Sequence, residues 1–160
     1  MYYASLETTV GKMKVYNYLN QKLVFFLDAE SKDDVLNQIV KMTVEAMELP
    51  EGDRFCKAIF DREKLVSTGI GMGVAIPHAK LTAYNDFFIA IAVLKSGVDW
   101  NTLDGAPVRL IFLIGGPDDK QTEYLKILSS LTGVLRDEEL RKNLIGAVSA
   151  KEVMNLFEII

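Results

Sequence analysis

The chain has 160 residues, a length typical of one domain, and 49% of them are hydrophobic, enough for a sizeable core. The net charge is −4 and the basic residues are scattered, so the chain lacks the basic run typical of nucleic-acid-binding proteins.

The longest apolar run, residues 87–94, is far shorter than the ~20 residues needed to cross a bilayer. No signal peptide precedes it, so we expect a cytoplasmic protein without membrane insertion. The single cysteine, Cys56, excludes an internal disulfide.

The first predicted helix follows Ser31, which is a favourable N-cap with acidic residues in the next turn. Apolar residues then recur at helical spacing as far as Met47. A Pro-Glu-Gly turn at 50–52 separates this helix from a second one over about 53–66.

Two apolar runs, 87–94 and 108–114, predict central strands covered on both faces, because each is too short for a comfortable buried helix. The last third of the chain is predicted to be helical. It contains an apolar stripe over 124–135 and a short helix over about 137–144. These elements predict a single-domain α/β sandwich, a mixed sheet flanked by helices on both faces.

A closing helix is predicted to begin with a capping box at Ser149. Val148 and Val153 are placed to form its hydrophobic staple, the contact that fixes how the chain enters the helix.

His78, the only histidine, follows a short apolar run and Pro77. Proline fixes its own φ and pushes the preceding Ile76 into an extended conformation, so the imidazole has a stiff mount. A neutral imidazole has one ring nitrogen free to attack phosphorus. A lone histidine without context is more often a structural residue at the edge of a core, and this alternative stays open.

Glycines alternate in the segment 68–73, Thr-Gly-Ile-Gly-Met-Gly. Such a loop can turn its backbone N–H groups toward an anion. The spacing matches neither the dinucleotide fingerprint nor the P-loop. Taken alone, the segment is more often a flexible turn that leads into a strand.

Arg62 interrupts an apolar stripe on the second helix, and we expect no acidic residue on that face. Its neighbours at helical spacing are Phe55, Ala58, Ile59, Leu65 and Val66. A guanidinium there must find an anion or reach solvent past the helix end. A phosphoryl group at the same end of the sheet would supply the missing charge. Pairing with a distant carboxylate, or simple exposure to solvent, is the alternative.

The segment from Glu63 through Ala79 resembles the active-site signature of the type 2 enzyme IIA domains of the bacterial phosphotransferase system, the fructose, mannitol and nitrogen-regulatory group. That signature has an acidic or amide residue, six free positions, an aliphatic residue, a small residue, two free positions, and then aliphatic-Ala-aliphatic-Pro-His-small. Its fixed places are filled by Glu63, Ile70, Gly71, Val74, Ala75, Ile76, Pro77, His78 and Ala79. The resemblance extends over about residues 14–160, which leaves 1–13 as an N-terminal extension.

The resemblance implies that His78 accepts a phosphoryl group, on Nε2, from the phosphohistidine of an HPr-like carrier. It implies transfer to a IIB component, or signalling to a regulatory target protein by the phosphorylation state, without a metal or other cofactor. Arg62 matches the arginine that assists the phosphohistidine in the family. Thr68, Gly69 and Gly71 of the glycine loop are the candidate phosphate contacts.

The chain departs from many relatives at Tyr124, which stands where they carry a second histidine near the start of a helix. Its hydroxyl could donate a hydrogen bond to phosphate in place of that imidazole. Tyr124 is therefore a further candidate phosphate contact.

Two branches of this function are open, sugar transport and nitrogen regulation. The chain carries no IIB, HPr or membrane segment, which favours a nitrogen-regulatory protein. A non-catalytic protein-binding regulatory module that keeps the fold is the alternative from another class. The presence of His78, Arg62 and the glycine loop together argues against that alternative. A metal-dependent enzyme is disfavoured because one histidine and one cysteine cannot form a first-row metal site without several carboxylates.

Overall fold

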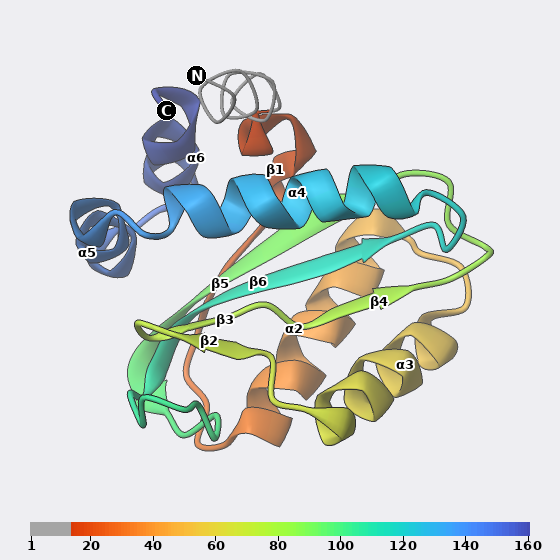
Figure 1. Ribbon diagram of the computed structural model, residues 1–160, viewed down its shortest axis with the longest axis horizontal. Helices are drawn as coiled ribbons and strands as arrows, with labels where there is room; N and C mark the ends of the chain where they lie inside the picture. The colour runs from red at the N-terminus through yellow and green to blue at the C-terminus, as the bar shows by residue number, and fades with distance from the viewer. Residues whose placement is uncertain (1–13) are drawn as a thin grey trace, which may run out of the picture.

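The computed structural model describes residues 14–160, and the predicted extension, residues 1–13, lies outside them. A mixed sheet forms the middle layer (Figure 1). Its strand order is β1 (Leu19–Leu27), β5 (Phe88–Val98), β6 (Val108–Gly116), β3 (Val74–Ala75) and β2 (Gly69–Gly71), and β4 (His78–Lys80) also pairs with β6. β5 runs antiparallel to β6, whereas β1 is parallel to β5, and β3 and β4 are parallel to β6.

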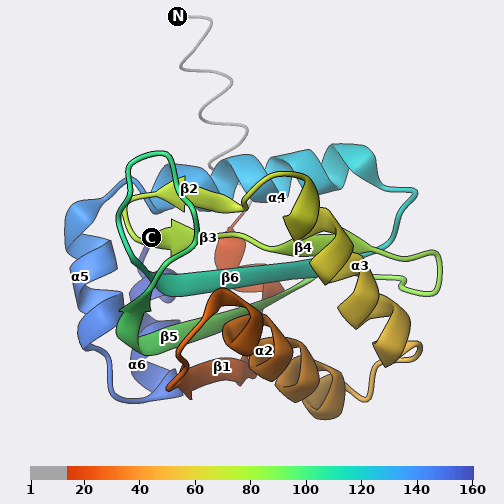
Figure 2. The same ribbon diagram turned by 90° about the horizontal axis from the view of Figure 1, so that it is seen from below.

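Helices cover both faces of the sheet, as the sequence predicts (Figures 1 and 2). One face is covered by α2 (Lys32–Met47) and α3 (Gly52–Leu65). The other is covered by the short 3₁₀ helix η1 (Val15–Tyr18), α4 (Gln121–Val134), α5 (Glu138–Gly146) and α6 (Ala150–Glu158). The predicted α/β sandwich is therefore confirmed.

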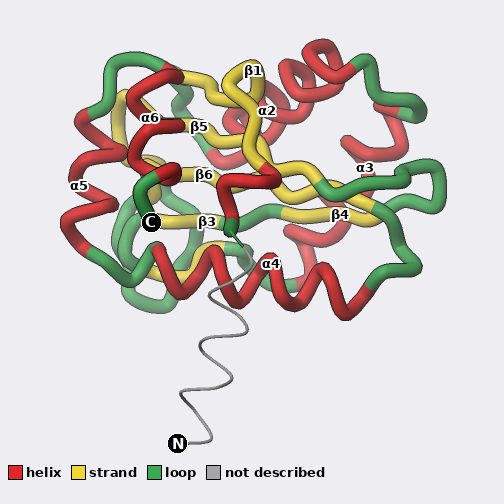
Figure 3. The backbone as a smooth tube through the Cα atoms, turned by 90° about the horizontal axis from the view of Figure 1, so that it is seen from above, coloured by secondary structure: helices red, strands yellow, loops and turns green. Residues whose placement is uncertain are grey.

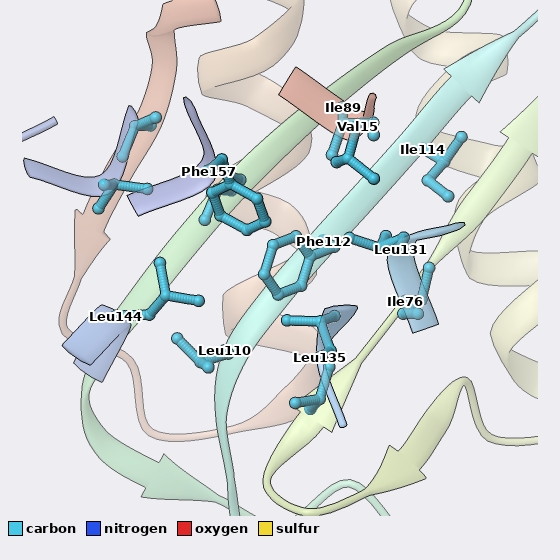
Figure 4. Close-up of a cluster of buried hydrophobic side chains, with 14 of the residues drawn as sticks. Val15, Ile76, Ile89, Leu110, Phe112, Ile114, Leu131, Leu135, Leu144 and Phe157 are labelled. Atoms are coloured by element: carbon cyan, nitrogen blue, oxygen red, sulfur yellow. The ribbon is translucent and has the colours of Figure 1, made fainter. Parts of the chain in front are cut away.

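The core consists of two apolar layers, one on each side of β5 and β6. Alternate residues of β5 enter opposite layers, with Ile89 and Ile91 facing α4 and Ala90 and Ala92 facing α2 and α3. Figure 4 shows the layer beneath α4, where Phe112 packs against Phe157 with ring centroids 6.0 Å apart. Both faces of these strands are buried over most of their length, which explains why the sequence there is almost entirely apolar.

Serine side chains cap two helices as predicted. Ser31 Oγ accepts a hydrogen bond from Asp34 N, and Ser149 Oγ accepts one from Glu152 N. The predicted hydrophobic staple is wrong, because Val148 is 80% exposed. Instead, Val148 N donates to the Glu152 carboxylate at 2.9 Å, so the chain enters α6 held by its backbone and the valine side chain points outward.

β3 and β4 are successive segments of one path along β6, as Figure 3 shows. The path is interrupted at Ile76 and Pro77, because proline has no N–H to donate to a ladder. Ile114 N nevertheless donates to Pro77 O at 2.9 Å, and this bond keeps the path attached to β6. His78 is thereby placed opposite Ile114, near the carboxyl end of β6.

Candidate active site

His78 lies on the first residue of β4, where the backbone aims alternate side chains at opposite faces. Ala79 is buried in the layer beneath α3, so His78 and Lys80 point to the other side, toward the start of α4. Both side chains are half-buried. The site is thus at the rim of the sheet, between α4 on one face and the end of α3 on the other.

The tautomer of His78 follows from its hydrogen bond. Nδ1 lies 3.0 Å from the carbonyl oxygen of Ile76, and a carbonyl can only accept, so Nδ1 carries the proton. Nε2 is left with its lone pair. Burial lowers the pKa of His78 below 6.5, and the positive charges of Arg62 and Lys80 lower the pKa further, against the opposing effects of the Ile76 bond and Glu63. The ring is therefore neutral near pH 7.

Arg62 lies near the carboxyl end of α3, and its charge acts on both His78 and Tyr124. Its Nη1 donates to the carbonyl oxygen of Val66 at 2.9 Å, and the side chain is half-buried. Arg62 and His78, both predicted site residues, are therefore brought together.

The expectation that no acidic residue shares the buried face of this helix is wrong. The buried stripe of α3 consists of Phe55, Ile59 and Glu63, which are spaced four residues apart, and Arg62 lies at the edge of that stripe. Glu63 can be buried because three groups donate to its carboxylate: Lys32 Nζ at 2.7 Å, Thr68 N at 3.0 Å and the Thr68 hydroxyl at 2.5 Å. Sequence reasoning missed Lys32, although a lysine in the first turn of a helix is an unfavourable choice that signals another role.

Tyr124 contacts His78 from the first turn of α4, with ring centroids 5.6 Å apart. Its ring is buried against Phe87 at 6.2 Å, and Lys80 Nζ lies 4.4 Å from the ring centroid. Burial raises the pKa of Tyr124 against the opposing charge of Arg62, so the phenol keeps its proton. Its hydroxyl donates to no group within residues 14–160, and no unpartnered side-chain oxygen is buried there, so it meets solvent beside His78.

The glycine loop forms a hairpin whose turn lies away from His78. Gly71 has φ +86°, and Met72 N donates to the Asp104 carboxylate at 2.9 Å. Gly71 pairs with Val74, which lies opposite Leu110, four residues along β6 from the partner of His78, a separation of about 13 Å.

The first residues of the same segment lie nearer to His78, because Thr68 O accepts from Ile76 N at 3.0 Å. Both donors of Thr68 are bound to Glu63, however, and Gly69 N donates to Ser67 Oγ at 3.2 Å. In this state of the protein, those three donors are directed to other groups.

Residues 17–159 match the family model described as "Phosphoenolpyruvate-dependent sugar phosphotransferase system, EIIA 2". The chain belongs to this family. A nitrogen regulatory protein of Pseudomonas aeruginosa is 38% identical over 130 residues, which are 79% of this chain and 82% of that protein. The fructose-specific EIIABC component of Bacillus subtilis is 34% identical over 145 residues, 90% of this chain, but the chain spans 23% of that longer protein.

Solved structures of EIIA proteins share the fold. The nitrogen regulatory protein IIA-Ntr of Neisseria meningitidis superimposes with a TM-score of 0.82 at 28% identity, covering 89% of this chain and 98% of that one. The mannitol IIA of Escherichia coli superimposes with a TM-score of 0.73 at 24% identity, covering 86% and 97%. This EIIA domain therefore has the architecture of both the nitrogen-regulatory and the sugar-specific groups.

Within residues 14–160, no group of three or more His, Cys, Asp or Glu side chains is arranged to hold a metal ion. No helix in that range is both long and apolar enough to span a membrane. Burial raises the pKa of Cys56, with a smaller effect of Asp53 in the same direction, so its thiol is a poor nucleophile. His78, in contrast, presents an unprotonated ring nitrogen, Nε2, because its Nδ1 donates to the Ile76 carbonyl.

Proposed function

We propose that this EIIA protein is a cytoplasmic phosphocarrier that takes a phosphoryl group on His78 Nε2 from the phosphohistidine of an HPr-like protein. The observation that carries the proposal is the hydrogen bond from His78 Nδ1 to the Ile76 carbonyl. It selects the tautomer in which Nε2 is the nucleophile, while the lowered pKa keeps the ring unprotonated.

The transfer is a single displacement at phosphorus. The Nε2 lone pair forms the new nitrogen–phosphorus bond as the bond to the donor imidazole breaks, and that electron pair returns to the donor ring. The Nδ1 proton stays in place, and the Ile76 carbonyl stabilises the positive charge that develops on the His78 ring. No cofactor takes part in this step.

Positive groups around His78 would hold the transferred phosphoryl oxygens. Arg62 and Lys80 already act on the ring electrostatically, and the Tyr124 hydroxyl meets solvent beside it. We propose Arg62 as the principal phosphate contact, because its planar guanidinium can donate two parallel hydrogen bonds. Contacts from Thr68 and Gly69 require their N–H groups to change partners, whereas Gly71 lies about 13 Å along the sheet from His78.

Two observations favour the nitrogen-regulatory branch over sugar transport. The nitrogen regulatory structure of Neisseria meningitidis superimposes better than the mannitol IIA, and the Pseudomonas aeruginosa relative has 38% identity. In this branch the phosphorylation state controls binding to a regulatory target protein. A solved complex of mannitol IIA with phosphorylated IIB indicates the alternative recipient, a IIB component. A binding module without phosphoryl chemistry is disfavoured by the prepared tautomer of His78.

The test is incubation of the protein with phosphoenolpyruvate, enzyme I and an HPr-type carrier. We expect one acid-labile phosphoryl group per chain on the wild type and none on His78→Ala. Mass spectrometry under neutral conditions counts the phosphoryl groups. Labelling of the alanine variant, or no labelling of a folded wild type by either an HPr or a nitrogen-branch carrier, contradicts the proposal.

A further inference from the structure

A largely buried ion pair adjoins the proposed phosphoryl-accepting site, and its carboxylate belongs to Glu63, the residue that follows Arg62 on α3. Lys32 Nζ contacts Glu63 at 2.7 Å, with side chains 19% and 4% exposed, and the ammonium lies 5.6 Å from the Trp100 ring centroid. Lys32 is the first residue of α2, where the helix macrodipole disfavours a positive charge. Burying two charges rarely improves stability over apolar residues of similar size. The pair therefore needs another reason.

One reason is the connection from Glu63 to His78. Glu63 accepts both the backbone N–H and the hydroxyl of Thr68. The Thr68 hydroxyl in turn accepts from Trp100 Nε1 at 3.2 Å, and Thr68 O accepts from Ile76 N. Ile76 O is the acceptor that selects the His78 tautomer. These hydrogen bonds form a continuous series from the Glu63 carboxylate to the His78 ring.

The second reason is charge. The negative charge of Glu63 is close enough to act on the His78 ring. An incoming phosphoryl group is also negative, so an uncompensated carboxylate there would repel it and oppose the attraction of Arg62. Lys32 supplies the compensating charge from another helix, α2.

We propose that Glu63 and Lys32 form a positioning pair for phosphoryl transfer: Glu63 holds Thr68, and through it the Ile76 carbonyl that orients His78, and Lys32 cancels the carboxylate charge behind the phosphoryl group. This inference rests on the proposed phosphocarrier function. In this proposal the acidic residue of the 63–79 segment, Glu63, acts indirectly, because it contacts neither the phosphoryl donor nor the phosphoryl group.

Four variants separate positioning from charge. Glu63→Ala removes the acceptor of Thr68, and Glu63→Gln keeps an acceptor oxygen but removes the charge. Lys32→Met leaves the carboxylate uncompensated, and the double variant Lys32→Met/Glu63→Gln removes both charges. Lys57→Met is the matched control, because it breaks the exposed Lys57–Asp61 pair on the same helix as Glu63.

The first measurement is the rate of phosphorylation of each folded variant by one phosphorylated HPr-type carrier, well below its melting temperature. We expect Lys32→Met to be about tenfold slower than the wild type, a Coulombic effect of roughly this size at close range in a partly buried site. Glu63→Gln, the double variant and Lys57→Met should stay within about threefold. Glu63→Ala should be phosphorylated more slowly than the wild type, because Thr68 loses its acceptor.

The second measurement is the ¹⁵N NMR spectrum of the His78 ring in tag-free protein, which is unambiguous because the chain has one histidine. The wild type should show a protonated Nδ1 and an unprotonated Nε2. Glu63→Ala should shift toward a mixture of tautomers, while Lys32→Met should keep the wild-type pattern, because Thr68 still binds Glu63. If the Glu63–Lys32 pair had a purely structural role, both variants would have a lower melting temperature, but their ring spectra would not differ in this way.

Wild-type ring signals and rate in Glu63→Ala would overturn the positioning role. A wild-type rate in Lys32→Met, or a double variant as slow as Lys32→Met, would overturn the charge role. A wild type that accepts no phosphoryl group would contradict the proposed function instead, and the ring signals of Glu63→Ala would still decide whether Glu63 positions His78.

Discussion

At the scale of single residues, Arg62 offers the sharpest test of phosphate binding. Arg62→Lys keeps a positive charge but loses the planar fork, so we expect a loss of about 1–3 kcal/mol in transition-state stabilisation, a tenfold to hundredfold slower phosphorylation. The fold should persist, because a lysine can still reach the Val66 carbonyl or solvent.

The control for Arg62 is Arg54→Lys, on the same helix, where the exposed side chain pairs with Glu51 at 3.1 Å. This variant should match the wild type. Phosphorylation of Arg62→Lys at the wild-type rate, with an unchanged circular dichroism spectrum, would mean that Arg62 does not bind phosphate and has only a structural role at the end of α3.

Tyr124 provides a second residue-scale prediction, because its hydroxyl has no partner within residues 14–160. In Tyr124→Phe we expect phosphorylation about fivefold slower, the size of one net hydrogen bond, with stability unchanged within about 0.5 kcal/mol. Tyr84→Phe should show the reverse, because the Tyr84 hydroxyl donates to Pro50 O at 3.1 Å and lies outside the site. Unequal stability but equal rates in Tyr124→Phe would mean that the phenol only packs.

His78 and Arg62 stand out in the sequence because each is unusual within its own segment, and the structure places them close enough for the Arg62 charge to act on the His78 ring. Their roles in phosphoryl transfer stay predictions. It could not show that Glu63 is buried, since the helical wheel alone places Arg62 and Glu63 equally near Ile59. Only the packing of α3 on the sheet decides which of the two enters the core. The partner that makes this burial possible, Lys32, is thirty-one residues away and belongs to another helix.

At the scale of elements, the sequence predicts the amphipathic helices and the two strands that are buried on both faces, but it does not predict the edge strand β1. The apolar run 87–94 predicts the first part of β5, and the run 108–114, interrupted by Arg109, predicts β6. β5 extends beyond its apolar run to Val98 through exposed residues. β1 was not predicted, because Asn20, Gln21 and Lys22 are exposed at the sheet edge and break the apolar pattern.

The glycine hairpin is the element whose role needs an experiment. Gly71→Ala places a Cβ 2.9 Å from Asp104 Oδ2 at a left-handed φ, so we expect a loss of about 1–3 kcal/mol in the free energy of unfolding. The phosphorylation rate of the folded variant should equal that of the wild type, because the turn lies away from His78. Urea unfolding and the transfer assay measure the two effects separately.

Gly105→Ala is the matched control for backbone strain, because Gly105 also has a positive φ, +69°, but nothing lies within 4 Å of the added Cβ. It should lose less stability than Gly71→Ala. A transfer rate that falls in Gly71→Ala and not in Gly105→Ala would restore the glycine loop as a phosphate contact.

At the scale of the whole molecule, the sheet connects the two sides of the site. α3 contributes Arg62 from one face and α4 contributes Tyr124 from the other, and β4 at the rim is within reach of both. Aromatic rings pack over glycines at the end of β6, where a Cβ on Gly115 or Gly116 would meet Phe88 or Phe87. Phe87 thus packs against Gly116 on one side and contacts the Tyr124 ring on the other, so it connects Tyr124 to the end of β6.

The pH dependence of global stability reports the state of His78, because it is the only histidine in the chain. Burial holds its pKa in the folded protein below 6.5, so as the pH falls the unfolded chain takes up this proton first. The contribution of His78 to stability is therefore complete above pH 6.5 and is lost as the pH falls through the folded-state pKa.

Carboxylates also titrate in acid, so the comparison must be with His78→Gln, in which they are unchanged. We expect the melting temperature of the wild type to fall relative to that of His78→Gln between pH 7.5 and pH 5. Parallel curves for the two proteins would mean that the imidazole is protonated as easily when folded as when unfolded, and would remove the electrostatic basis for a neutral nucleophile.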